Sequence, residues 1–376
     1  MKRMFGRLAG LFLLVIATVA VSAQKGKKPV IIGYVGGYDG NIVKTEAIAA
    51  KKLSHINYAF VDIKDNRAWL HNEKTDTLNF RKLNELKKIN PDLKILISIG
   101  GWTWSKNFSD AMLSDTSTAS FAQSAADIVA AHNLDGVDID WEYPGMKGDN
   151  NKFRPEDRTG YTIMFKELRE RLDVLGKRTG KKYLVTTAIG GSREFLQHTQ
   201  LEIAQNYLDY INLMSYDFDG TYDNMAAHHS NLYTPSNMPY IYSVDVCVKN
   251  MMLVGVKPEK IVVGLPFYGK GRVVKSVENN GLYQIPVRPA YGGGYSYMKD
   301  SLVNRKGFVR YWDKESEMPY LFNKERKTVL FYDDEESVRL KCDYIKKHKL
   351  GGAMFWEYFS DPKLYLLNTL VKEFGY

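Results

Sequence analysis

The chain has 376 residues, of which 44% are hydrophobic and 25% charged, so it is long enough for one large globular domain or two medium ones. Its formal net charge is +9, but the basic residues are spread along the chain in short groups, which argues against a nucleic acid as a partner. The two Cys and seven His show no spacing typical of a metal site, so we expect neither a metal nor another cofactor. The pair His228 and His229 is most simply part of a loop.

The N-terminus has the pattern of an export signal. Lys2 and Arg3 belong to a basic region, the apolar run Leu11–Val21 is too short to cross a bilayer, and small residues precede Gln24. Residues 1–23 are therefore predicted to be a signal peptide, cleaved near Ala23 and Gln24. We expect a secreted or periplasmic monomer without stable membrane insertion. Nothing in the sequence says whether Cys247 and Cys342 form a disulfide.

Short apolar runs alternate with amphipathic helical patterns along the rest of the chain. The apolar runs are rich in β-branched and aromatic residues, as are strands of a parallel sheet covered by helices. Eight runs are predicted as strands: Val30–Gly36, His55–Ile63, Leu93–Gly101, Gly136–Tyr143, Tyr183–Gly190, Tyr210–Asp217, Lys260–Tyr268 and Gly352–Phe359. Helical spacing recurs between them, in the segments around Phe80–Leu86, Phe121–His132, Tyr161–Leu175, Val244–Val254 and Ser337–His348.

Eight alternations of strand and helix predict an α/β fold, a (β/α)₈ TIM barrel over residues 24–376. An open doubly wound sheet is disfavoured because the glycines after the first strand lack the spacing of a phosphate-binding loop. About sixty residues separate the seventh strand from the helix near Glu335, which is too long for a structureless loop. We therefore expect a small α+β insertion over residues 272–330, on the carboxyl rim of the barrel and beside a groove.

The fourth predicted strand places three acids on one face. Asp138, Asp140 and Glu142 alternate with apolar residues, and side chains two apart on a strand share a face. Such a row of carboxyl groups has at least one member protonated at neutral pH unless it faces water freely. The ends of the other strands carry mainly aromatic residues: Tyr34, Phe60, Trp102, Met214, Tyr216, Asp217 and Trp356. Acids ringed by aromatic rings favour a sugar-cleaving site; the alternative is a solvated rim above an ordinary barrel core.

Four motifs carry a family resemblance. Asp135–Glu142 resembles the DxxDxDxE signature of family 18 glycoside hydrolases, the chitinase family. Ser98–Trp102 resembles its SxGG motif, Met214–Asp217 its MxYD motif, and Trp356 its eighth-strand tryptophan. The insertion resembles that of the deep-groove chitinases. The match spans essentially the whole mature chain, and no additional chitin-binding module is visible.

The resemblance implies a secreted chitinase that cuts β-1,4 bonds between N-acetylglucosamine units with retention of configuration. In this family the substrate's own acetamido oxygen is the nucleophile, giving an oxazolinium ion. Glu142 would be the acid and then the base. Asp140 would orient the acetamide, Asp138 would share a proton with Asp140, and Tyr216 would donate to the acetamido oxygen.

The same resemblance implies which residues bind the substrate. Tyr34 and Ser98 would hold Asp138, Trp356 would form the floor under the reacting sugar, and Trp102 would be a platform on the leaving-group side. The other expected substrate-binding residues are Asp217, Met214, Tyr143 and Phe60. The family also implies non-proline cis peptides at Ala59–Phe60 and Trp356–Glu357.

Three alternatives share these motifs. An endo-β-N-acetylglucosaminidase acting on N-glycans and a peptidoglycan hydrolase both need the same acetamido chemistry. A chitin-binding lectin usually lacks the acid, which is present here as Glu142. The sequence leaves open whether attack is endo or exo, and whether polymer or oligosaccharide is preferred.

Overall fold

The computed structural model of the chain describes residues 28–218, 225–236, 238 and 242–376. The predicted signal peptide, residues 1–23, and its cleavage point near Ala23 lie outside the described residues.

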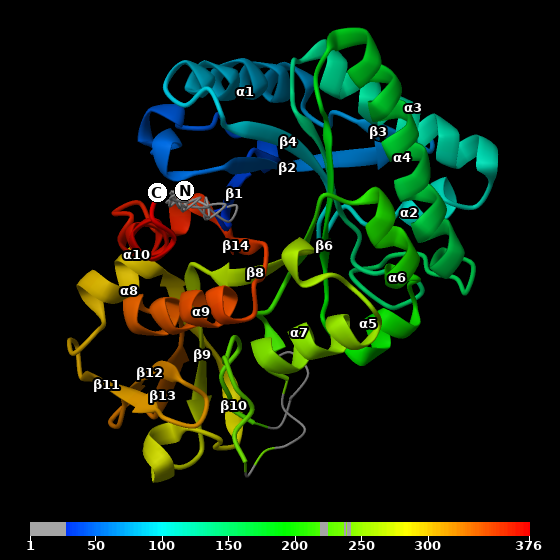
Figure 1. Ribbon diagram of the computed structural model, residues 1–376. Coiled ribbons are helices and arrows are strands. Elements are labelled where there is room, and N and C mark those ends of the chain that lie inside the picture. The colour runs from blue at the N-terminus through cyan, green and yellow to red at the C-terminus, as the bar shows by residue number, and fades with distance from the viewer. Residues whose placement is uncertain (1–27, 219–224, 237, 239–241) are drawn as a thin grey trace, which may run out of the picture.

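Eight parallel strands form a closed barrel, which confirms the predicted fold (Figure 1). They are β1 (Val30–Gly36), β2 (His55–Lys64), β4 (Lys94–Gly100), β5 (Gly136–Asp140), β6 (Leu184–Ile189), β7 (Tyr210–Leu213), β8 (Ile261–Pro266) and β14 (Gly352–Trp356). The barrel closes because β1 pairs in parallel with both β14 and β2. A short strand that was not predicted, β3 (Arg67–Trp69), pairs antiparallel with the end of β2.

Helices cover the outside of the barrel. They are α1 (Glu73–Glu85), α2 (Phe108–Ala111), α3 (Asp115–Ala131), α4 (Asp157–Thr179), α5 (Arg193–Gln197), α6 (Leu201–Ala204), α7 (Val244–Leu253), α9 (Glu335–Lys347) and α10 (Tyr365–Phe374). Helix α9 begins at Glu335, not at the expected Ser337, because Asp334 is its N-cap and forms a reciprocal capping box with Ser337. Gly180 ends α4 in the left-handed conformation that favours glycine. Among the described helices, none is long and apolar enough to cross a membrane.

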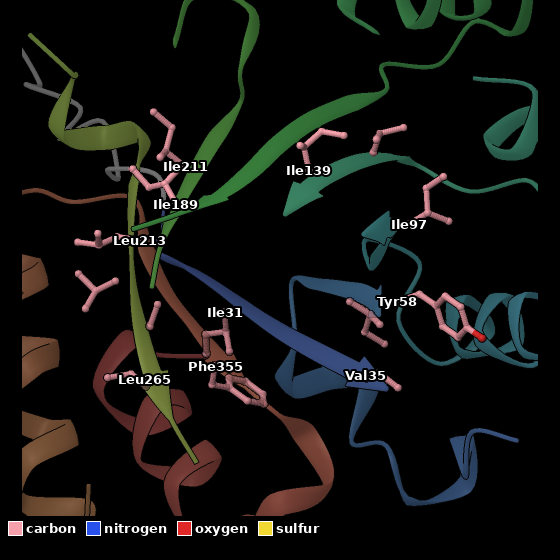
Figure 2. Packing of buried hydrophobic residues seen from close by; sticks show 14 of the residues in the cluster. Ile31, Val35, Tyr58, Ile97, Ile139, Ile189, Ile211, Leu213, Leu265 and Phe355 are labelled. Carbon is pink, nitrogen blue, oxygen red and sulfur yellow. The ribbon is translucent and has the colours of Figure 1, made fainter. Parts of the chain in front are cut away.

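The alternating faces of the barrel strands separate two apolar regions. Outward-facing side chains such as Ile31, Ile139, Leu265 and Phe355 pack beneath the helices, as Figure 2 shows. A smaller cluster that includes Ile32, Val262 and Met354 belongs to the opposite set of strand positions and contacts the Trp356 ring. Asp138 and Asp140 alternate with Ile139 along β5, so they share the inner face. The fold thus directs both acids into the barrel.

A five-stranded antiparallel sheet follows β8, as the fold prediction expected (Figure 1). Its strands are β9 (Tyr268–Val274), β10 (Pro286–Gly294), β11 (Phe308–Asp313), β12 (Met318–Asn323) and β13 (Thr328–Phe331), with helix α8 (Tyr295–Ser301) between β10 and β11. The chain passes from β8 into β9 across one residue, Phe267, which packs flat on Phe355 of β14 with ring centroids 4.1 Å apart. Because of this short connection, the first residues of β9 lie beside the carboxyl end of the barrel.

Candidate active site

Asp138 lies deepest in the row of acids and accepts four hydrogen bonds. Its side chain is completely buried. The hydroxyls of Tyr34 and Ser98 each donate to Oδ2 at 2.8 Å, while Thr186 Oγ1 at 2.6 Å and Asn212 Nδ2 at 3.1 Å donate to Oδ1. Burial raises the pKa of Asp138, and the four donors work against that rise. Tyr34 and Ser98 thus contact the acid that the sequence assigned to them.

Thr186 and Asn212 are two partners of Asp138 that the sequence analysis missed. Ser98, Asp138 and Thr186 occupy one register across β4, β5 and β6, and Asn212 belongs to the adjacent β7. The available signal was a polar residue inside an otherwise apolar strand, because buried polar groups in such strands need partners.

Asp140 is the buried middle acid of the row. It is 4% exposed, and no described group bonds its buried Oδ1. Burial raises its pKa well above the ordinary value, and the neighbouring charges of Glu142 and Asp138 raise it further. Asp138 has four donors and Asp140 Oδ1 has none among the described residues, so the negative charge of this pair belongs on Asp138. We expected Asp138 and Asp140 to share a proton directly, but no hydrogen bond joins these two described side chains.

Glu142 follows the strand rather than belonging to it. The predicted strand continued to Tyr143, but β5 ends at Asp140. Glu142 is 9% exposed, and burial raises its pKa to about 7, against the lowering effect of a hydrogen bond with Tyr143. A carboxyl group with such a pKa is protonated in a large fraction of molecules near neutral pH, as a general acid requires.

Asp217 is held by three side chains of other segments. Its Oδ1 accepts from the Tyr268 hydroxyl at 2.6 Å, pairs with Lys270 Nζ at 2.9 Å and lies 3.4 Å from His229 Nδ1. Burial opposes its ionisation, but His229 and Lys270 outweigh this and keep the pKa of Asp217 below the ordinary range. These three partners were not expected from the sequence, in which His229 was predicted only to be part of a loop.

Aromatic rings surround the acids. Trp356 stacks on Phe60 with centroids 5.5 Å apart and lies 5.8 Å from the Tyr34 ring. Trp102 is 53% exposed and meets Tyr143 edge-on at 6.4 Å. The expected site residues thus fall into a lower group around Asp138 and Trp356 and a pair on the rim, in which Trp102 is exposed and Tyr143 is half-buried.

Tyr216 and Met214 complete the set of expected residues. Both are half-buried and pack against the inner apolar cluster that contains Trp356. Burial and the nearby charges of Asp140 and Asp217 raise the pKa of Tyr216 well above the ordinary value, so its hydroxyl remains a hydrogen-bond donor. The Tyr216 ring meets that of Tyr268 at 6.3 Å, which brings the barrel and the inserted sheet together beside Asp217.

The two predicted cis peptides, Ala59–Phe60 and Trp356–Glu357, are present, and Glu142–Tyr143 is a third. Cys247 and Cys342 are both buried and unpaired. Over the described part of the chain, no group of three or more His, Cys, Asp or Glu side chains has the arrangement of a metal site.

A buried row of acids with aromatic rings at the carboxyl end of a (β/α)₈ barrel is typical of a glycoside hydrolase. The family model described as "Glycosyl hydrolases family 18" matches residues 30–361. The chain therefore belongs to glycosyl hydrolase family 18.

Individual relatives are similar over most of this chain. Chitinase A1 of Niallia circulans is 36% identical over 90% of this chain, which spans 58% of that protein's length. Chitinase B of Serratia marcescens is 30% identical over 84% of this chain and 74% of its own length. Among solved structures, a family 18 N-acetylglucosaminidase from Paenibacillus barengoltzii is 38% identical, with a TM-score of 0.85, covering 92% of this chain and 99% of that one.

Proposed function

We propose that the protein is a chitinase that hydrolyses β-1,4 bonds between N-acetylglucosamine units by a retaining, substrate-assisted mechanism. The observation that carries the proposal is the pairing of a buried acid, Glu142, with a neighbouring buried acid, Asp140, whose Oδ1 accepts nothing from the described protein. An acetamido N–H donating to that oxygen would satisfy a buried acceptor that otherwise costs about 1–3 kcal/mol. A sugar lacking the acetamide would leave it unsatisfied.

The carboxyl groups that act electrostatically on Glu142 are poor nucleophiles. Burial and the charges of Glu142 and Asp138 raise the pKa of Asp140, which favours its protonated form, and Asp217 is held by Tyr268, Lys270 and His229. A retaining hydrolase with two protein carboxyls needs an ionised one free to attack the anomeric carbon. The acetamido oxygen of the substrate is therefore the better candidate for nucleophile, as is general in this family.

The reaction follows in two steps. Glu142 gives its proton to the glycosidic oxygen as the bond to the anomeric carbon breaks and the acetamido oxygen bonds to that carbon. Asp140 accepts the acetamido N–H, and the neutral Tyr216 hydroxyl donates to the acetamido oxygen. Glu142, now a carboxylate, takes a proton from water, which attacks the anomeric carbon and opens the oxazolinium ring with overall retention.

The aromatic residues would bind the sugars on either side of the bond that breaks. Trp356, stacked on Phe60, would support the reacting sugar, and the exposed Trp102 would contact the leaving group. Asp217, Met214 and Tyr143 would complete the binding surface. The names of the relatives agree with this substrate: two are chitinases and one is an N-acetylglucosaminidase.

The test is hydrolysis of a chromogenic chitobioside and chitotrioside by wild type and Glu142→Gln. We expect Glu142→Gln to lose on the order of 10²- to 10⁴-fold in kcat, as positioned general acids contribute that much. Glu167→Gln is a matched control, because Glu167 lies on the outer helix α4, where it pairs with Arg171 at 3.2 Å. Equal rates for wild type and Glu142→Gln would overturn the assignment.

Two further arms test the mechanism and the substrate. Proton NMR of the first product should show the β-anomer, and an inverted product would exclude acetamido participation. Chitooligosaccharides, a high-mannose glycoprotein and peptidoglycan, incubated in parallel, separate the proposed substrate from the two alternatives. The ratio of monomer to dimer released from chitooligosaccharides reports whether attack is at chain ends or at internal bonds.

We also propose that residues 1–23 direct export to a secreted or periplasmic location. The support is the basic, apolar and small-residue pattern of that segment. N-terminal sequencing of the protein recovered outside the cytoplasm should begin at Gln24, and an intact Met1 would contradict the proposal.

A further inference from the structure

We infer that Ser105 is a positioning residue for the catalytic acid, Glu142. Ser105 is completely buried, and its Oγ accepts the backbone N–H of Glu142 at 2.8 Å. The same hydroxyl donates to the carbonyl oxygen of Gly101 at 2.9 Å, or to that of Asp140 at 3.1 Å. One side chain thus connects the backbone after β4 with the backbone on either side of Trp141.

The need for Ser105 follows from where the barrel strands stop. β4 ends at Gly100 and β5 ends at Asp140, and the Gly101 N–H donates to the Asp140 carbonyl at 2.8 Å. Glu142 lies beyond this last pairing, so its N–H donates to a side chain instead of to a neighbouring strand. A buried N–H without a partner is costly, and the Ser105 hydroxyl supplies that partner.

The loop that carries Ser105 also carries Trp102. Gly101 has φ +80°, a conformation that favours glycine, and there the chain turns out of β4. It exposes Trp102 and then returns to place Ser105 against Glu142, with the Trp104 N–H donating to Gly101 O at 3.2 Å. The proposed leaving-group platform and the backbone of the acid are therefore fixed to the same short loop.

Removing the Ser105 hydroxyl should displace Glu142 without removing any group that touches the substrate. The unpaired N–H would draw the segment towards water, and a misplacement of about 1 Å can cost roughly 10²-fold in rate. Displacement would also hydrate the carboxyl group, whose burial is the main cause of its raised pKa. The expected loss of rate rests on the proposed function. The expected fall in the pKa of Glu142 does not, because it is independent of which sugar is cleaved.

The experiment compares Ser105→Ala with Ser124→Ala. Ser124 is a matched control on the outer helix α3: it is 4% exposed, its Oγ accepts the Ala68 N–H at 2.9 Å and donates to the Phe121 carbonyl at 2.8 Å. Both variants lose a buried hydroxyl with the same pattern of bonds, so both should melt at a lower temperature. Only Ser105→Ala should lose kcat, by roughly 10- to 100-fold, with KM little changed.

The second readout is the pKa of Glu142, followed by NMR from the labelled carboxyl carbon without substrate. It should fall in Ser105→Ala and stay at the wild-type value in Ser124→Ala. If Ser105→Ala does not fold, Ser105→Thr and Ser105→Val replace it, since they differ only in the hydroxyl; Thr should retain more activity and the higher pKa of Glu142.

An unchanged kcat or an unchanged Glu142 pKa in Ser105→Ala would overturn the inference. An equal loss of kcat in Ser124→Ala would overturn it too, because general destabilisation would then explain the effect. An inactive wild type would instead count against the proposed function, and the NMR titration would still decide the role of Ser105.

Discussion

Replacing Lys341 with Met should destabilise the protein strongly, because it leaves a buried charge without its partner. Lys341 on α9 and Asp333 are both inaccessible to solvent, and Nζ lies 2.7 Å from Oδ1 and 2.8 Å from Oδ2. The hydroxyls of Ser337 and Ser230 also donate to Asp333, at 2.7 and 2.8 Å. These bonds connect three segments: helix α9, the residues that follow the inserted sheet at Asp333, and the segment that carries Ser230 next to His229.

The expected cost is about 3–5 kcal/mol, the range measured when one partner of a buried ion pair is removed. Two serine hydroxyls remain on Asp333, but they are neutral and cannot compensate a full charge. At roughly 2–4 °C per kcal/mol for a large domain, the melting temperature should fall by about 6–20 °C. Thermal and urea denaturation followed by circular dichroism measure both quantities.

Two comparisons make the result decisive. Lys346→Met changes an exposed lysine of the same helix, which pairs with Asp343 at 2.9 Å and should cost no more than about 1 kcal/mol. The double variant Lys341→Met with Asp333→Asn removes both charges and should recover much of the lost stability. If the double variant is no more stable than Lys341→Met alone, an unpaired charge is not the cause and the reasoning is wrong.

Three other predictions concern the site. Because Glu142 acts as an acid with a pKa of about 7, kcat/KM should fall as pH rises through that value, and a rise there would show that the deprotonated form is active. Tyr143→Phe should move this alkaline limb to higher pH, because the lost hydrogen bond favours the ionised carboxyl; a shift to lower pH contradicts it. Trp102→Ala should raise KM for chitooligosaccharides roughly 3- to 10-fold, because the ring contact with a sugar contributes about 0.5–1.5 kcal/mol. The melting temperature should stay unchanged, since the ring is 53% exposed, and a loss of stability would place the ring in the core.

The barrel could be predicted because its strands are buried on both faces and read as nearly continuous apolar runs. Their ends could not be predicted. Glu142 and Tyr143 continue the alternating pattern of β5 in the sequence, yet the strand stops at Asp140. It stops there because the neighbouring strand β4 has ended and its chain turns away at Gly101. The three-residue strand Arg67–Trp69 is too short to give a periodic signal. Helix α10 was overlooked, although Leu366, Leu367 and Leu370 have helical spacing.

The sequence motifs located the acids, but not the side chains that bind and position those acids. Asp217 was expected to bind substrate, whereas its partners His229, Tyr268 and Lys270 lie outside any motif used to find it. They come together only when the inserted sheet folds beside β7, so no local pattern encodes the contact. Ser105 was missed for the same reason, since its bond to Glu142 joins residues 37 positions apart.

The register of three strands favours negative charge on Asp138 over Asp140. Ser98, Asp138 and Thr186 are direct neighbours across β4, β5 and β6, so two donors reach Asp138 simply because the strands pair in this register. With Tyr34 and Asn212 they stabilise negative charge at the bottom of the row. That charge helps keep the proton on Asp140, which has no such donors on Oδ1.

A shift of β5 by one residue would destroy this arrangement of donors and acids. Because strand side chains alternate between faces, the shift would put Ile139 where the donors are and turn both aspartates towards the helices. Four donors would lose their acceptor, and two acids would enter an apolar layer. The same register therefore stabilises the barrel and places the donors around Asp138 before any substrate binds.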